Sequence, residues 1–243
     1  MRILLILISI FLITSAKADE IYNLIKIPNL EIYKVNNDNG IRYLNSKKAF
    51  KIGVEDNISC NQTNKNNLKN KFPSLEKNLN FYNAEFLKKN NIKYIVICED
   101  LFISDINTGG IPDIDKRTLI IDINFNQKYF ERMIHHEIFH MIQNSYLDYF
   151  DENKWSLLNK KDFSYTECST CSDRLNLDLY ENTNGFLTEY SKSIASEDMA
   201  EVFSFLMISK IQIENKSEKD KILKNKINFI KEGLSKIDGS FVF

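Results

Sequence analysis

The 243-residue chain lacks several features that would point to nucleic acids or membranes as partners. Its 32 basic and 33 acidic residues are interspersed and form no basic stripe, so nothing indicates nucleic acid or an anionic membrane surface. The apolar run from Ile3 to Ile13 is too short to span a bilayer comfortably. No cysteine follows that run directly, which argues against a lipid-anchored lipoprotein. Histidine is also scarce, with only three residues, and this later limits the choice of metal ligands.

The N-terminus has the organisation of a secretory signal. Met1-Arg2 is a short basic start, the apolar run follows, and Ala16-Lys17-Ala18 has the A-x-A form of a cleavage site before Asp19. We therefore expect cleavage after Ala18, a secreted or periplasmic bacterial protein, and no stable membrane insertion of the mature chain. An uncleaved N-terminal anchor is the alternative. The leader carries two basic residues and no acidic residue, so its removal changes the formal net charge from −1 to −3.

Four cysteines in an exported chain favour disulfides. Sequence alone allows three pairings; Cys60–Cys98 with Cys168–Cys171 is favoured because the second pair is local. A thioredoxin-type role for the C-x-x-C at 168–171 is weakly supported, since it lies in a polar Ser/Thr/Asp-rich stretch. A four-cysteine zinc site is less favoured still, because Cys60 and Cys98 lack a short ligand spacing.

The three histidines lie within six residues, and His136-Glu137-Ile138-Phe139-His140 forms an H-E-x-x-H motif. On a helix, His136 and His140 stand one turn apart on the same face, so two imidazoles can bind one ion. Glu137 is then placed to reach a water on that ion, which is the arrangement of a zinc peptidase. A helix with an incidental histidine pair is the alternative.

The flanking residues support a largely buried helix around the motif. Asn124 or Asn126 can cap its start. His135 points about 100° away from His136, so a packing or hydrogen-bonding role is expected for it rather than metal ligation. The apolar residues that surround the motif are Tyr129, Phe130, Met133, Ile134, Phe139, Met141 and Ile142.

Zinc needs a third protein ligand, and no histidine is left to supply it. A longer H-E-x-x-H-x-x-G-x-x-H pattern is absent, because Gln143 and Tyr146 occupy the decisive positions. A carboxylate on a later helix is therefore expected, and Glu197 with Glu201, four residues apart among apolar neighbours, is the best candidate.

In this interpretation Glu197 ligates zinc, and Glu201 accepts a hydrogen bond from the free N–H of a ligand histidine. A helix with two solvated glutamates is the alternative for this pair. The rival ligands, which lack a comparable helical context, are Glu167, Glu181, Glu189 and Asp198.

The segment Gly-Phe-Leu-Thr-Glu-Tyr at 185–190, followed after six residues by Glu197-x-x-Ala200-Glu201, resembles the lethal factor family of gluzincin metallopeptidases. The resemblance covers roughly residues 133–207. It implies that His136, His140 and Glu197 hold one zinc ion per chain and that Glu137 is the general base. It also implies that Tyr190 steadies the tetrahedral intermediate, a role that suits a phenol able to donate to a developing oxyanion.

The expected fold is α+β and zincin-like, with a small mixed sheet packed on the H-E-x-x-H helix and a mainly helical C-terminal half. Residues 19–243 are expected to form a single domain, with a strand-and-helix part at 19–125 and a helical part at 126–243. Helices are predicted at about 73–89, 196–210 and 216–237, and β-branched runs predict strands at 92–97 and 118–123.

The sequence as a whole predicts an exported zinc-dependent endopeptidase that acts on a protein or peptide. Two alternatives stay open: a catalytically idle zinc-binding or interaction module, and a zinc amidase that acts on cell-wall peptide. The natural substrate and the oligomeric state are not predicted.

Overall fold

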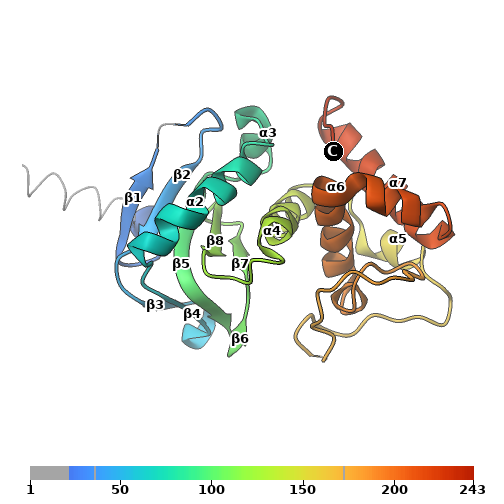
Figure 1. The fold of residues 1–243 in the computed structure, drawn as a ribbon, viewed down its shortest axis with the longest axis horizontal. Coiled ribbons are helices and arrows are strands. Elements are labelled where there is room, and N and C mark those ends of the chain that lie inside the picture. The colour runs from blue at the N-terminus through green and yellow to red at the C-terminus, as the bar shows by residue number, and fades with distance from the viewer. Residues whose placement is uncertain (1–21, 36, 172) are drawn as a thin grey trace, which may run out of the picture. The chain divides into compact units, whose positions relative to one another are not determined.

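A computed structural model describes residues 22–35, 37–171 and 173–243 (Figure 1). The expected signal peptide, residues 1–18, lies outside the described residues. The chain divides into two compact units: the first comprises residues up to Glu76, Tyr82–Lys88 and Ile92–Phe125, and the second Lys77–Phe81, Lys89–Asn91 and Asn126–Phe243. In the part of the chain that is described, no helix is long and apolar enough to cross a membrane.

The first unit is built on an eight-stranded mixed sheet with β5 (Tyr94–Ile103) at its centre. One part of β5 pairs in parallel with β2 and β8, and its other part pairs antiparallel with β4 and β6. Buried β-branched residues explain why β5 and β8 are central, because both faces of these strands are covered. The remaining strands are β1 (Leu30–Lys34), β2 (Arg42–Ser46), β3 (Phe50–Ile52), β4 (Ile58–Asn61), β6 (Ile106–Asn107), β7 (Gly110–Asp113) and β8 (Thr118–Asp122).

Helix α2 (Lys65–Leu79) lies across one face of this sheet, where Phe72 packs edge-on against Tyr43 of β2 (Figure 1). The prediction of a helix start at Pro73 was wrong. The Asn64 side chain accepts hydrogen bonds from the backbone N–H groups of Asn66 and Asn67, and so begins the helix earlier. The same prediction also merged two helices, since α3 (Ala84–Lys89) follows as a separate element.

The predicted disulfide Cys60–Cys98 is confirmed and joins β4 to β5 in the core of the first unit. Its Cα–Cα distance is 6.0 Å, within the ordinary range.

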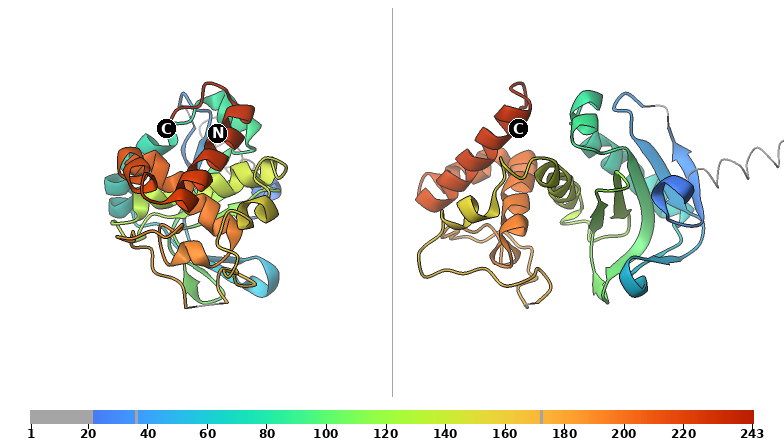
Figure 2. Two further views of the ribbon diagram at one scale, coloured as in Figure 1. Left: turned by 90° about the vertical axis from the view of Figure 1, so that its right-hand side faces the viewer. Right: turned by 180° about the vertical axis from the view of Figure 1, so that it is seen from behind.

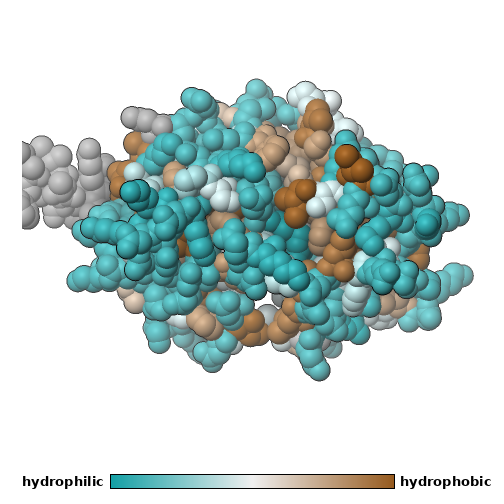
Figure 3. All heavy atoms as spheres, viewed as in Figure 1, coloured by the Kyte–Doolittle hydropathy of each residue, from teal (hydrophilic) through white to brown (hydrophobic). Residues whose placement is uncertain are grey.

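Hydrophilic residues cover most of the visible surface of α2 (Figure 3), as expected for a helix with one buried face.

The second unit is mainly helical. Its long helices are α4 (Phe130–Ser145), α6 (Ala195–Ser217) and α7 (Lys221–Ile237), and α4 packs on α6 (Figure 2). Two short elements, α5 (Glu152–Ser156) and the 3₁₀ helix η2 (Tyr190–Lys192), lie at either end of a long irregular connection. The mixed α+β class and the helical C-terminal half are thus confirmed.

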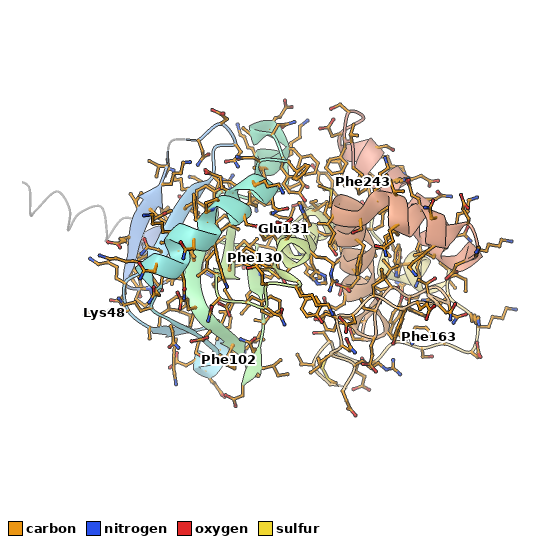
Figure 4. The ribbon with its side chains drawn as sticks, in the orientation of Figure 1. Lys48, Phe102, Phe130, Glu131, Phe163 and Phe243 are labelled. Atoms are coloured by element: carbon orange, nitrogen blue, oxygen red, sulfur yellow. A yellow bond between two sulfur atoms is a disulfide. The ribbon has the colours of Figure 1, made fainter. Side chains whose placement is uncertain are left out.

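Helix α4 starts without the predicted asparagine cap. Phe130 is its first residue, with Glu131 beside it (Figure 4), and Tyr129 at the cap position makes no side-chain capping bond. The Asn126 side chain instead accepts from the backbone N–H of Lys128 in the preceding turn, and the Asn124 backbone N–H donates to Asp122. Neither asparagine caps the helix, because each is engaged in a turn before it.

Helices α6 and α7 are held together by a buried ion pair. Lys226 Nζ lies 2.6 Å from Asp198 Oδ2, and both side chains are fully buried. The same carboxylate oxygen accepts from Trp155 at 2.9 Å and from Tyr165 at 2.6 Å. Lys226 also donates to the carbonyl of Gly185 at 2.8 Å, which ties the connection before η2 to α7.

Candidate metal centre

The two motif histidines lie on one face of α4 and point to a common place. His136 is buried and His140 is half-buried, and their Nε2 atoms are 3.1 Å apart. Two imidazole nitrogens at this separation cannot hydrogen-bond to each other unless one carries a proton. Their convergence therefore requires a proton or another cation between them.

Glu197, in the first turn of α6, completes the group. Its Oε2 lies 2.8 Å from His136 Nε2 and 3.2 Å from His140 Nε2. Ligand atoms about 2.0–2.2 Å from a tetrahedral zinc ion are about 3.3–3.6 Å apart. The observed separations of 2.8, 3.1 and 3.2 Å are shorter, so the three side chains would move slightly apart around an ion. Two imidazoles and one carboxylate are a ligand set that zinc takes at catalytic sites. The residues therefore fit the ion.

The electrostatics of the group also favour a cation. Burial opposes the charged form of His136, yet the hydrogen bonds and charges of Glu197 and Glu201 raise its pKa to about 10. For Glu197 burial again opposes the charge, but His140 and His136 lower the pKa of the carboxyl below its ordinary value. A buried place that stabilises positive charge this strongly can bind a metal ion when the histidines give up their protons.

Glu201 lies one turn after Glu197 on α6 and orients His136. Its Oε1 is 3.0 Å from His136 Nδ1, so the ring donates there and turns its Nε2 toward the metal position. Thr188 donates to the other oxygen of Glu201 at 2.8 Å. Glu201 thus contacts one of the two predicted ligand histidines, and its supporting role at a metal site stays a prediction.

Sequence reasoning missed Arg132, which lies one turn before His136 on α4. Its guanidinium forms a short ion pair with Glu201, and it donates to the Leu177 carbonyl at 2.9 Å. It also stacks 4.4 Å from the centre of the Phe205 ring. Burial opposes the charge of Glu201, but Arg132 and His136 lower its pKa to about 2, so the carboxylate is ionised. The i, i+4 spacing of Arg132 and His136 was the one signal available in the sequence.

Glu137 is buried beside the two histidines. Burial raises its pKa to about 7, while the positive charges of His136 and His140 pull in the opposite direction. A carboxylate with a pKa near neutrality can both accept and release a proton at working pH.

Tyr190, at the start of η2, lies next to the same group. Its ring centre is 6.0 Å from that of His136, and the carboxylates of Glu197 and Glu137 lie near its phenol. Burial and the nearby carboxylates of Glu197 and Glu137 raise its pKa well above the usual value. The phenol therefore keeps its proton and can act as a hydrogen-bond donor.

The other candidate residues lie elsewhere. His135 faces away from the group: its Nε2 is 3.0 Å from Asn78 Oδ1, and burial lowers its pKa to about 3, so it is neutral. Asp198 is instead bonded to Lys226 and to the aromatic side chain of Trp155. Across the described residues, the group that could hold a metal is His136, His140 and Glu197, and it includes neither Glu167, Glu181 nor Glu189.

The predicted disulfide Cys168–Cys171 is confirmed in the connection between α5 and η2, with a Cα–Cα distance of 5.2 Å. All four cysteines are thereby paired.

One comparison with known proteins gives a family. The model of the family described as "Putative zinc-binding metallo-peptidase" matches residues 10–238, nearly the whole chain and all of the residues of the candidate site. No curated protein matches the sequence.

Proposed function

The chain belongs to this family of zinc-binding metallo-peptidases, and on that premise we propose that it is an exported zinc-dependent endopeptidase. The observation that carries the proposal is the convergence of His136 Nε2, His140 Nε2 and Glu197 Oε2 within 3.2 Å of one another. We propose these three residues as ligands of one zinc ion per chain.

The chemistry divides among the residues around this group. Zinc bound there would supply Lewis acidity and lower the pKa of its water. Glu137 accepts a proton from the attacking water at its carboxylate and passes it to the nitrogen of the leaving amine. Tyr190 donates its phenolic hydrogen to the oxygen of the scissile carbonyl as negative charge develops there. Glu201 keeps His136 in the tautomer whose Nε2 is free to ligate.

Peptide hydrolysis is favoured over an idle zinc-binding module because of Glu137 and Tyr190. A module that only binds metal needs neither a buried carboxylate with a pKa near 7 nor a protonated phenol beside it. A zinc amidase that cleaves cell-wall peptide would use the same residues, so it differs from the proposal in substrate alone.

Finer features belong to the same proposal. These are the zincin-like packing of the sheet on the helix of the motif, the kinship with the lethal factor family, and export after cleavage at Ala18. The two disulfides support an oxidising compartment, because cytosolic thiols are kept reduced.

Replacing Glu137 by glutamine tests the function directly. Glu137→Gln keeps the size of the side chain and touches no proposed ligand, so we expect full zinc content with peptide hydrolysis reduced by a factor of roughly 10² or more. Glu131→Gln, in the first turn of the same helix, is the matched control and should hydrolyse at the normal rate. A peptide library and purified peptidoglycan, each with and without chelator, distinguish endopeptidase from amidase. Unchanged hydrolysis in Glu137→Gln contradicts the mechanism.

A further inference from the structure

The 3₁₀ helix η2, which carries Tyr190, is too short to hold itself in place. It spans Tyr190–Lys192 and has only two local turns. The Lys192 N–H bonds to the Glu189 carbonyl at 3.0 Å, and the N–H and hydroxyl of Ser193 bond to the Tyr190 carbonyl at 3.0 and 2.7 Å. A three-residue turn of this kind contributes little stability of its own. Its position must come from neighbouring segments.

Three residues of the connection between α5 and η2, namely Thr166, Arg174 and Asn176, bond to the backbone of η2 or of Ser193, which follows it. On one side, Thr166 donates to the Ser193 carbonyl from both its backbone N–H and its hydroxyl, each at 2.7 Å. On the other side, the Tyr190 N–H donates to the Asn176 carbonyl at 3.1 Å. Arg174 adds a third contact, a hydrogen bond of 2.7 Å to the carbonyl of Lys192.

The Cys168–Cys171 disulfide lies between these two sets of contacts. Thr166 precedes it, and its hydroxyl also contacts the Cys168 carbonyl at 2.9 Å; Arg174 follows it. The cross-link limits how far the chain can spread between Cys168 and Cys171, since it removes conformations that an open loop would sample. Cys171 is exposed and Cys168 half-buried, so the bond is not required to fill the core.

A separate set of contacts ties η2 to the metal centre. Ser191 and Thr188 bond to each other through their hydroxyls and backbone N–H groups, and Thr188 donates to Glu201 at 2.8 Å. None of these bonds involves Cys168 or Cys171, and Glu201 is also held by Arg132 and His136. A change at the disulfide should therefore reach Tyr190 through the backbone of η2 more than it reaches the metal ligands.

We propose that the Cys168–Cys171 loop, with Thr166 and Arg174 at its ends, is a positioning element for Tyr190, acting through the backbone of η2. The proposal rests on the proposed function, in which Tyr190 donates to the developing oxyanion. The disulfide takes no part in the reaction. It limits the freedom of the phenol and thereby keeps the donor close to the place it must occupy in the transition state.

The test uses the full mature chain with Cys168→Ser and Cys171→Ser together, which leaves no thiol pair to bind metal. We expect unchanged zinc content and a kcat about ten- to hundredfold lower, the scale on which small misplacements of a positioned group reduce rates. In a Tyr190→Phe background the same double change should cause little further loss, because the donor it positions is already gone. Arg174→Met, which leaves the disulfide in place, should lower kcat in the same Tyr190-dependent way. It replaces the serine variant as the test if that variant folds poorly.

Amide hydrogen exchange separates this inference from the proposed function. Exchange at Tyr190 and Ser193 should accelerate in the serine variant while exchange in the core of α4 is unchanged. Normal kcat in a hydrolytically active serine variant, an equal loss of kcat with and without the Tyr190 hydroxyl, or a loss of zinc would each overturn the positioning role. If the native protein hydrolyses no peptide, the proposed function fails, and the exchange at these two amides alone decides the inference.

Discussion

Replacing Arg132 by methionine should weaken both the fold of the second unit and its hold on the metal. Arg132 and Glu201 form an ion pair whose side chains are only 5% and 1% exposed. Methionine preserves much of the packing against Phe205 but leaves the Glu201 carboxylate buried without its cation. Removing one partner of a buried ion pair costs about 3–5 kcal/mol of unfolding free energy.

The effect on metal binding follows from the same contact. Without Arg132, the pKa of Glu201 should rise from about 2, and the carboxylate becomes a weaker acceptor for His136 Nδ1. Loss of such supporting partners typically lowers metal affinity by a factor of about 10–100. We therefore expect Arg132→Met to lose zinc more readily than the native protein in competition with a chromophoric chelator.

Lys128→Met is the matched control, because Lys128 also lies at this end of α4 but pairs with Asp178 at the surface, where the two side chains are 62% and 50% exposed. Its loss should change neither thermal stability nor zinc affinity appreciably. Thermal unfolding with chelator present measures the fold, and chelator competition measures the site. The double variant Arg132→Met with Glu201→Gln should recover part of the stability but not the zinc affinity. Equal behaviour of the Arg132 and Lys128 variants in both assays would refute the reasoning.

Three further outcomes are expected. Tyr190→Phe should lower turnover by roughly 10²–10³ with unchanged zinc content, because one oxyanion donor is lost while the ring still packs; steady-state kinetics beside metal analysis checks this. Glu197→Ala should lose most of the zinc, as measured by elemental analysis, and retention of full occupancy and activity would show that another carboxylate is the ligand. Asp220 accepts bonds from Thr183 and from the backbone N–H of Leu223, so its pKa lies below the ordinary value although burial opposes this. The stabilisation that the ionised Asp220 carboxylate provides is therefore present above about pH 4 and is lost as the pH falls through its folded-state pKa. The stability deficit of Asp220→Asn should accordingly shrink in acid. A deficit that is constant with pH contradicts this assignment.

The sequence was most informative where chemistry and spacing coincide. The H-E-x-x-H motif and the E-x-x-A-E segment each place their residues by helical periodicity, and the structure brings His136, His140, Glu197 and Glu201 together. The disulfide pairing was predictable because Cys168 and Cys171 are three residues apart, and pairing them locally leaves Cys60 for Cys98. The buried strands β5 and β8 were visible as β-branched runs.

Features that depend on tertiary contacts were not visible. An arginine on an amphipathic helix normally lies in solvent, and its i, i+4 spacing from His136 alone did not indicate that Arg132 would meet a glutamate 69 positions away. The start of α2 was hidden because its first two turns are rich in Asn and Lys, although Leu68 and Phe72 are buried there. The pairing of Asp198 with Lys226 was equally hidden, since each residue alone resembles an ordinary charged residue on a helix.

The anchoring of Asp198 also bears on what happens to the site when the metal is removed and replaced. Glu197 and Asp198 are consecutive residues of α6, so their side chains diverge by about 100°. One faces the metal position, and the other is bound by Lys226, Trp155 and Tyr165. The backbone that carries the ligand is therefore fixed whether or not an ion is present. Zinc should load into an already formed cage, with chelation and reloading that are reversible and leave the helical content unchanged.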